Sequence, residues 1–118
     1  MHIDDNEEDR SFFRESLAEV DIEVILIEVA SAEEAMKTMA QVLPDLIVVD
    51  CNMPGLNRLE FIRNIRQNPK FNTTKIVLLN TPAQARINLP QYGADNSYVK
   101  PASVEKFKII INELLSLK

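Results

Sequence analysis

Apolar runs alternate along the chain with segments whose apolar residues recur at helical spacing. The short apolar runs predict strands at residues 1–3, 22–29, 46–49, 76–79 and 97–99. The helical spacing predicts helices at residues 7–20, 31–42, 59–66, 82–92 and 103–115. Strands and helices that alternate in this way predict an α/β fold, a doubly wound five-stranded parallel sheet with helices on both faces and right-handed crossovers.

Local signals mark several of the boundaries. Ser31 opens a capping box, and Pro44 ends the helix that follows it. Pro90 weakens the helix predicted at 82–92, and Gly93 is suited to a left-handed conformation at its end. The first strand has only three residues before Asp4, so we expect the chain to lack a few residues at its amino end.

The composition is that of a folded domain and changes this picture little. The chain has 118 residues, of which 46% are hydrophobic and 26% charged, and we expect a single domain over residues 1–118. A net charge of -5 predicts no nucleic-acid surface. Its apolar runs are far shorter than the ~20 residues of a membrane helix, and the first residues carry no signal-peptide core. We therefore expect a cytoplasmic protein without membrane contact.

Polar side chains follow the strands at their carboxyl ends. These residues are Asp4, Asp5, Asp50, Asn80, Thr81 and Lys100. We expect them to converge, because the carboxyl ends of parallel strands share one edge of the sheet. Crowded carboxylates repel one another, and a hard divalent cation such as Mg²⁺ relieves that repulsion. A carboxylate with a metal on one side and an ammonium on the other can act as a nucleophile toward phosphorus.

The chain resembles the response-regulator receiver domains of two-component signalling, the CheY-like family, over essentially its whole length. Four segments carry the resemblance: IDDNEEDR, DLIVVDCNMPGLNRLEF, KIVLLNT and GADNSYVKP. The family has the flavodoxin-like fold with strand order 2-1-3-4-5. The resemblance therefore implies this order, and a phosphoacceptor domain rather than an enzyme.

The resemblance also implies residue roles. Asp50 would accept the phosphoryl group, and Lys100 would contact it, with a cis bond to Pro101. Asp5 would bind Mg²⁺ directly and Asp4 mostly through water, while Asn52 would lend its backbone carbonyl. The implied partners are a histidine kinase or phosphotransfer protein, and a downstream protein or an attached effector domain. A homodimer is compatible with the resemblance, and no nucleic acid is expected to bind this domain.

Three positions depart from the family pattern. Asn80 falls where the family usually has Thr or Ser, although Thr81 follows it. Arg58 falls where the family usually has Gly, and a positive φ there would strain an arginine. Ser97 occupies the usual aromatic position, with Tyr98 next along the strand and expected to point to the opposite face.

Other polar residues have simpler interpretations. We expect the acidic run Glu7, Glu8 and Asp9 to be the solvated first turn of a helix. His2 is expected near the exposed beginning of the first strand, without a metal role. Cys51 is the only cysteine, so no internal disulfide forms, and we expect it to act as a small hydrophobic residue.

The pattern leaves several functions to compare. The first is a receiver that takes a phosphoryl group onto Asp50 and switches a protein-interaction surface. The second is a degenerate receiver that acts as a phosphorylation-independent scaffold, which the three departures favour. A haloacid-dehalogenase-like phosphatase would need an Asp where Asn52 stands. An FMN binder would need a phosphate-cradling loop after the first strand, where the chain has acidic residues.

Overall fold

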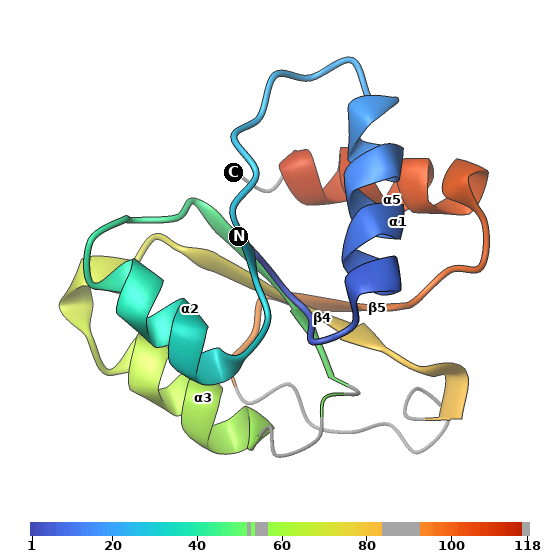
Figure 1. Ribbon diagram of the computed structural model, residues 1–118. Coiled ribbons are helices and arrows are strands. Elements are labelled where there is room, and N and C mark those ends of the chain that lie inside the picture. Colours follow the sequence, from blue (N-terminus) through green and yellow to red (C-terminus); the bar gives the residue numbers. More distant parts are fainter. Residues whose placement is uncertain (52, 54–56, 84–92, 117–118) are drawn as a thin grey trace.

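Five parallel strands form the centre of the protein (Figure 1), seen here in a computed structural model that describes residues 1–51, 53, 57–83 and 93–116. The strands lie in the order β2-β1-β3-β4-β5, which confirms the expected order. Their bounds are β1 His2–Ile3, β2 Glu28–Val29, β3 Leu46–Asp50, β4 Lys75–Asn80 and β5 Asn96–Val99. Each neighbouring pair is parallel, and the flavodoxin-like arrangement predicted from the sequence is therefore correct.

The second strand is much shorter than predicted. Of residues 22–29, only Glu28 and Val29 pair with a neighbouring strand. Their partner β1 is itself two residues long, so the preceding residues have no strand beside them to complete a ladder. The amide of His2 still donates to the carbonyl of Ile27 at 2.8 Å, which adds one hydrogen bond between this segment and β1.

Helices begin at side-chain caps close to the predicted positions. Their bounds are α1 Glu7–Ala18, α2 Ala32–Met39, α3 Arg58–Arg66, the 3-10 turn η1 Pro69–Phe71, and α5 Val104–Leu115. Asn6, Ser31, Asn57 and Ser103 cap α1, α2, α3 and α5 by accepting from a backbone N–H three residues later. The helix predicted at 82–92 falls mostly on residues 84–92, which lie outside the described residues. None of the described helices is long and apolar enough to cross a membrane.

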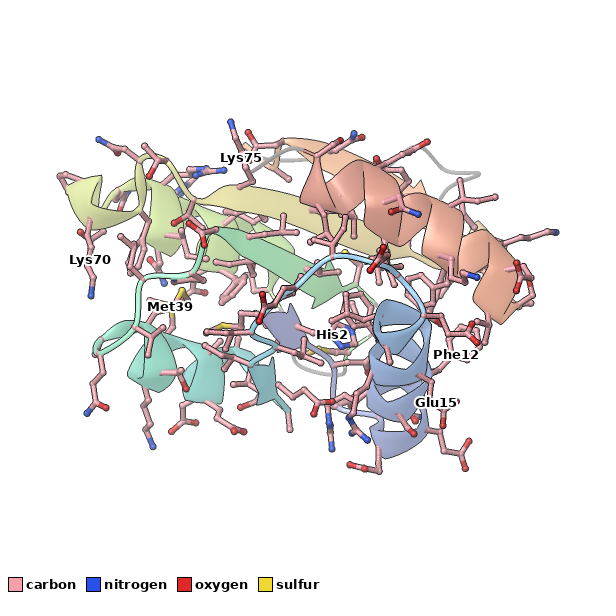
Figure 2. The ribbon with its side chains drawn as sticks, turned by 90° about the horizontal axis from the view of Figure 1, so that it is seen from above. His2, Phe12, Glu15, Met39, Lys70 and Lys75 are labelled. Atoms are coloured by element: carbon pink, nitrogen blue, oxygen red, sulfur yellow. The ribbon has the colours of Figure 1, made fainter. Side chains whose placement is uncertain are left out.

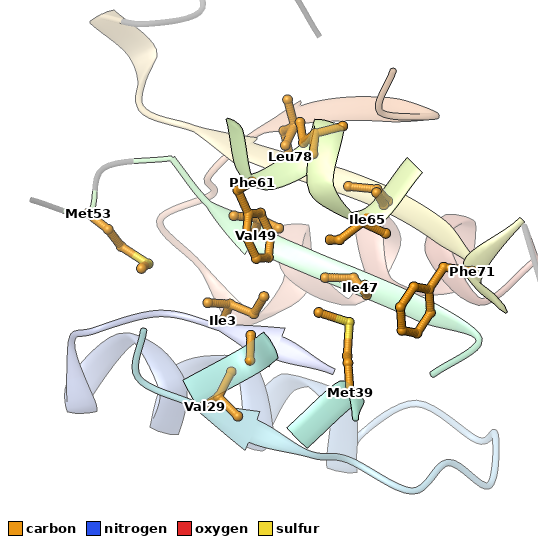
Figure 3. Close-up of a cluster of buried hydrophobic side chains, with 13 residues drawn as sticks. Ile3, Val29, Met39, Ile47, Val49, Met53, Phe61, Ile65, Phe71 and Leu78 are labelled. Carbon is orange, nitrogen blue, oxygen red and sulfur yellow. The ribbon is translucent and has the colours of Figure 1, made fainter. Parts of the chain in front are cut away.

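One face of the sheet is covered by α2 and α3, and the other by α1 and α5 (Figure 1). Figure 3 shows the core on the first of these faces, where Met39 of α2 and Ile65 of α3 pack against Ile47 and Val49 of β3. On the other face, Val48 packs with a second cluster that includes Phe13, Phe107 and Ile111. Successive residues of β3 thus point into different cores, which explains why residues 46–49 are continuously apolar.

Arg66, at the end of α3, ties that helix to the beginning of β5. Its guanidinium donates to the carbonyl of Thr74 at 2.8 Å, to the carbonyl of Gly93 at 3.1 Å, and to the carboxylate of Asp95 at 2.8 Å. Asp95 also accepts from the amide of Ile76 in β4 at 2.8 Å. Gly93 has a φ of 99°, the left-handed conformation predicted for it. These bonds fix where β5 begins and hence where Lys100, just past its end, is presented.

The expectation that His2 lies near an exposed strand end is wrong. Its side chain is 1% exposed and lies between the sheet and α1 (Figure 2), with its ring stacked on that of Phe13 at 4.2 Å. The short first strand has neighbours on both sides, and α1 covers its face, so even its first residue is enclosed. Burial lowers the pKa of His2 to about 3, and the charge on Lys100 adds to this shift. Neither ring nitrogen has a hydrogen-bond partner within the described part of the chain.

The first prediction concerns His2 and the pH dependence of stability. Because its pKa is lowered in the folded protein, the unfolded chain binds more protons below about pH 6.5, and His2 costs stability as the pH falls. Replacing it in His2→Phe keeps the stacked ring and removes the titration. Relative to wild type, the variant should gain about 2 kcal/mol in free energy of unfolding between about pH 7.5 and about pH 5. Urea denaturation at the two pH values measures this gain, and an unchanged difference between the proteins would contradict the buried neutral imidazole.

Candidate functional site

The carboxyl ends of the strands bring the predicted polar residues together. Asp4 and Asp5 follow β1, Asp50 is the last residue of β3, and Lys100 follows β5. One oxygen from each of Asp4, Asp5 and Asp50 can be chosen so that all three lie within 4.8 Å of one another. The ammonium of Lys100 lies beside two of these carboxylates, at 3.2 Å from Asp4 and 3.3 Å from Asp50. The convergence expected from the order of the strands is therefore observed.

Asp4 is the most enclosed of these acids, with no exposed side-chain surface. One carboxylate oxygen accepts from the amide of Asn6 at 2.9 Å, and the other faces Lys100. The pKa of Asp4 is raised to about 6, because burial and the negative charge of Asp50 raise it by more than the Asn6 hydrogen bond and Lys100 lower it. Ionisation of the Asp4 carboxyl group is therefore unfavourable in this position unless a cation lies close to it.

Asp50 is also buried, with 2% of its surface exposed. It ends β3 opposite Leu79 of β4, and the amide of the next residue, Cys51, still donates to the carbonyl of Leu79 at 2.9 Å. Hydrogen bonds to β4 thus hold the chain on both sides of the Asp50 side chain. Cys51 is half-buried and packs at the margin of the core beneath α2 and α3, in agreement with its predicted apolar role.

Lys100 is the shared cation of the site. Its backbone amide donates to the carbonyl of Asn80 at 2.8 Å, which fixes the base of the side chain at the end of β4. Burial alone would lower the pKa of Lys100, but the carboxylates of Asp9, Asp50 and Asp4 together raise it, so the ammonium stays charged. The bond from Lys100 to Pro101 was expected to be cis, and this is wrong: the described residues contain no cis peptide bond. Trans is also the form that most X–Pro bonds adopt.

Asp9 belongs to the site, although the sequence led us to expect a solvated helix turn there. Its carboxylate lies 2.7 Å from the Lys100 ammonium, and its side chain is 38% exposed. The neighbouring Arg10 donates to the backbone carbonyl of Asp4 at 2.7 Å. A usable signal was present in the sequence, because α1 begins at the same edge of the sheet and an acid in its first turn can reach that edge. Helix amphipathicity alone does not reveal it.

The other residues predicted for the site are Asn80, Thr81 and Asn52, and the structure describes the first two. Asn80 ends β4 and Thr81 follows it; both are half-buried and both make interactions with their surroundings. They lie at the correct edge of the sheet, one and two residues past the partner of Asp50. Asn52, whose backbone carbonyl was expected to bind the metal, lies outside the described residues.

Two of the positions that depart from the family pattern, Arg58 and Ser97, can be interpreted from the structure. Arg58 is the first residue of α3 and has a helical backbone, so the strain of a positive φ does not arise there. Tyr98 packs with the core beneath α1 and α5, away from the core that contains Leu78. Burial raises the pKa of Tyr98, and a hydrogen bond to Glu113 of α5 adds to the shift. The aromatic ring next to Ser97 is therefore engaged with α5.

The donor set at this edge suits a hard divalent cation. Carboxylate oxygens are the ligands that Mg²⁺ prefers, and Mg²⁺ commonly uses one or two carboxylates while it keeps several waters. The acids Asp4, Asp5 and Asp50 supply such oxygens from a shared edge, and Asp5 is exposed where a hydrated ion would approach. Softer ligands are absent from this cluster as the described residues form it. The residues present therefore fit Mg²⁺.

Comparison with known proteins gives the family. The model of the response regulator receiver domain matches residues 1–112. The hybrid signal transduction histidine kinase D of Dictyostelium discoideum is 32% identical over 118 residues, which are 98% of this chain and 7% of the kinase. The probable chemotaxis protein CheY of Rhizobium etli is 26% identical and is matched over 92% of this chain and 85% of its own length. The chain thus spans a small part of one relative and most of the other.

Solved structures agree on the fold. The phosphorylated cyanobacterial phytochrome response regulator RcpA has a TM-score of 0.82 at 24% identity, over 99% of this chain and 93% of its own. The receiver domain of the sensor histidine kinase PA1611 from Pseudomonas aeruginosa has a TM-score of 0.75 at 22% identity, over 98% and 94% of the two chains. Receiver domains of this kind occur both in histidine kinases and in response regulators. The chain belongs to the response-regulator receiver domain family of two-component signalling, and it has the family's CheY-like fold.

Proposed function

We propose that the protein takes a phosphoryl group onto Asp50 from a histidine kinase or phosphotransfer protein, in the presence of Mg²⁺, and thereby switches a protein-interaction surface. One observation carries the proposal. The buried Asp50 carboxylate has an ammonium at 3.3 Å and two further carboxylates within the span of a single small cation. A buried structural acid would need the cation, but it would gain nothing from two further carboxylates beside it.

The chemistry follows from these neighbours. A carboxylate oxygen of Asp50 attacks the phosphorus of a phosphohistidine, a new P–O bond forms, the P–N bond breaks, and the imidazole leaves. The Lys100 ammonium stabilises the charge on the phosphoryl oxygens during this transfer. Asp4, Asp5 and Asp50 would hold Mg²⁺, with the carbonyl of Asn52 as a further candidate ligand. The bound ion would supply additional neutralisation of the same oxygens.

Two solved structures of similar fold support this assignment. The RcpA structure is of the phosphorylated protein, and the PA1611 receiver domain has a magnesium ion coordinated in its active site cleft. The acids of the present chain occupy the same kind of edge in a sheet of the same order. We therefore infer the same ion and the same modification for this chain.

The output of the switch is where this chain departs from its family. We propose that Asn80 donates a hydrogen bond from its amide to the phosphoryl group, with the Thr81 hydroxyl as the neighbouring alternative. Tyr98 already bonds to α5, so the usual aromatic movement at the position of Ser97 is replaced by another route or is lost. This observation favours the second candidate, a scaffold that binds its partner without phosphorylation. The partner of either form is a downstream protein or an attached effector domain, and a homodimer is compatible with both.

The second prediction separates these two functions. Wild type incubated with acetyl phosphate and Mg²⁺ should gain the mass of one phosphoryl group, because Lys100 and two acids that could hold the ion lie beside Asp50. Asp50→Asn should gain nothing while it keeps the wild-type circular dichroism spectrum. Intact-protein mass spectrometry measures both. Unmodified wild type under these conditions would favour the scaffold, and a modified Asp50→Asn would place the acceptor elsewhere.

The third prediction concerns the metal. Asp5 is exposed, so Asp5→Asn should fold normally but bind Mg²⁺ at least roughly tenfold more weakly, because a charged ligand becomes neutral. A chelator in excess should also stop adduct formation in wild type. Asp21→Asn is the matched control, an exposed acid beyond the opposite end of α1 with the same change in charge. Isothermal titration with Mg²⁺ compares the three proteins, and equal affinities for Asp5→Asn and Asp21→Asn would refute the assigned ligand.

A further inference from the structure

Lys100 makes its shortest ion pair with Asp9, a residue outside the metal-ligand cluster. The Nζ–Oδ2 distance is 2.7 Å, compared with 3.2 Å to Asp4 and 3.3 Å to Asp50. The Lys100 side chain is 19% exposed and the Asp9 side chain 38%, so this pair lies where the site meets solvent. In the structure, Lys100 therefore lies closer to Asp9 than to Asp50, the proposed phosphoacceptor.

The metal-ligand cluster does not account for the position of Asp9. The acids whose oxygens could share one ion are Asp4, Asp5 and Asp50, and Asp9 is not among them within the described residues. Its position is fixed by the first turn of α1, where its amide donates to the capping side chain of Asn6 at 3.1 Å. The carboxylate is therefore presented toward Lys100 by a helix whose beginning is anchored next to Asp5.

Lys100 has a fixed base and a movable end. Its backbone is hydrogen-bonded to β4, while the ammonium ends a flexible four-carbon stem. An ammonium has three N–H donors, and three carboxylates already surround this one. A phosphoryl group on Asp50 would add acceptor oxygens on one side of it, so one of the existing bonds must lengthen or break.

We propose that Asp9 is a positioning residue that holds Lys100 in the resting state and competes with the phosphoryl group for its ammonium. This inference rests on the proposed function, in which Lys100 contacts the phosphoryl group on Asp50. Asp9 is the partner that Lys100 can release most readily, because it is the most exposed of the three and water can replace the lost bond. Asp9 thus slows the phosphorylation of Asp50 and speeds the loss of the phosphoryl group.

The test uses Asp9→Asn, which keeps the shape of the side chain and removes its charge. With acetyl phosphate and saturating Mg²⁺, the variant should be phosphorylated about three- to fivefold faster than wild type, the range expected for loss of one partly exposed ion pair. After the donor is removed, its adduct should decay more slowly by a similar factor. Asp9→Glu retains the charge and should return both rates toward those of wild type.

Glu8→Gln is the matched control. Glu8 is an exposed acid in the same helical turn, and the substitution changes the net charge by the same amount. A general electrostatic effect on an anionic donor, or on the helix dipole, would change both variants alike. If Asp9 pairs with Lys100 as proposed, the phosphorylation rate changes more in Asp9→Asn than in Glu8→Gln. A purely structural role of Asp9 would not change the lifetime of the phosphorylated adduct.

The outcomes separate this inference from the proposed function. A faster Asp9→Asn beside an unchanged Glu8→Gln supports the inference, and so does an adduct that forms only in Asp9→Asn. If wild type forms an adduct at Asp50 but the two variants behave alike, the role of Asp9 is overturned and the proposed function stands. If neither wild type nor Asp9→Asn forms an adduct, both are overturned.

Discussion

The ammonium of Lys100 lies among the carboxylates of Asp4, Asp9 and Asp50, and this one cation makes the edge of the sheet possible. Burying a carboxylate is costly unless a cation or hydrogen-bond donors lie close to it. Asp4 and Asp50 are both enclosed, and the pKa of Asp4 is raised by burial to about 6. Three of these charged groups follow directly from strand ends, so the site depends on the register of β1, β3 and β5.

The rest of the fold serves to hold that register. Val48 of β3 pairs with His2, and Val77 of β4 pairs with both Val48 and Asn96. The side chains of β3 alternate between two cores, so a shift of one residue would move each of them to the wrong face. Arg66 adds a fixed beginning to β5 through Asp95. The same packing that stabilises the sheet therefore also aligns Asp50 with Lys100.

Much of this could be predicted from the sequence, because apolar spacing and strand-end acids are local signals. Asp4, Asp5, Asp50 and Lys100 were placed at one edge correctly, since parallel strands leave no other arrangement. His2, the short β2 and Asp9 were not predicted. Burial of His2 depends on how α1 lies over the sheet, and the length of β2 depends on its partner β1. The pairing of Asp9 depends on a side chain ninety-one residues away, so the local helix pattern does not show it, and only the start of α1 at this edge of the sheet indicates that Asp9 could reach the site.

The most direct test of this arrangement is the stability of Lys100→Met, which keeps an unbranched apolar stem and removes the charge. Without Mg²⁺ at neutral pH, its free energy of unfolding should fall by about 2–4 kcal/mol, because buried carboxylates lose their cation. Mg²⁺ should then stabilise this variant more than wild type. Lys108→Met removes a cation whose ion pairs within the described residues are with the surface acids Glu19 and Glu105, and it should cost less than about 1 kcal/mol. Equal losses in the two variants, with equal responses to Mg²⁺, would contradict the central role of Lys100.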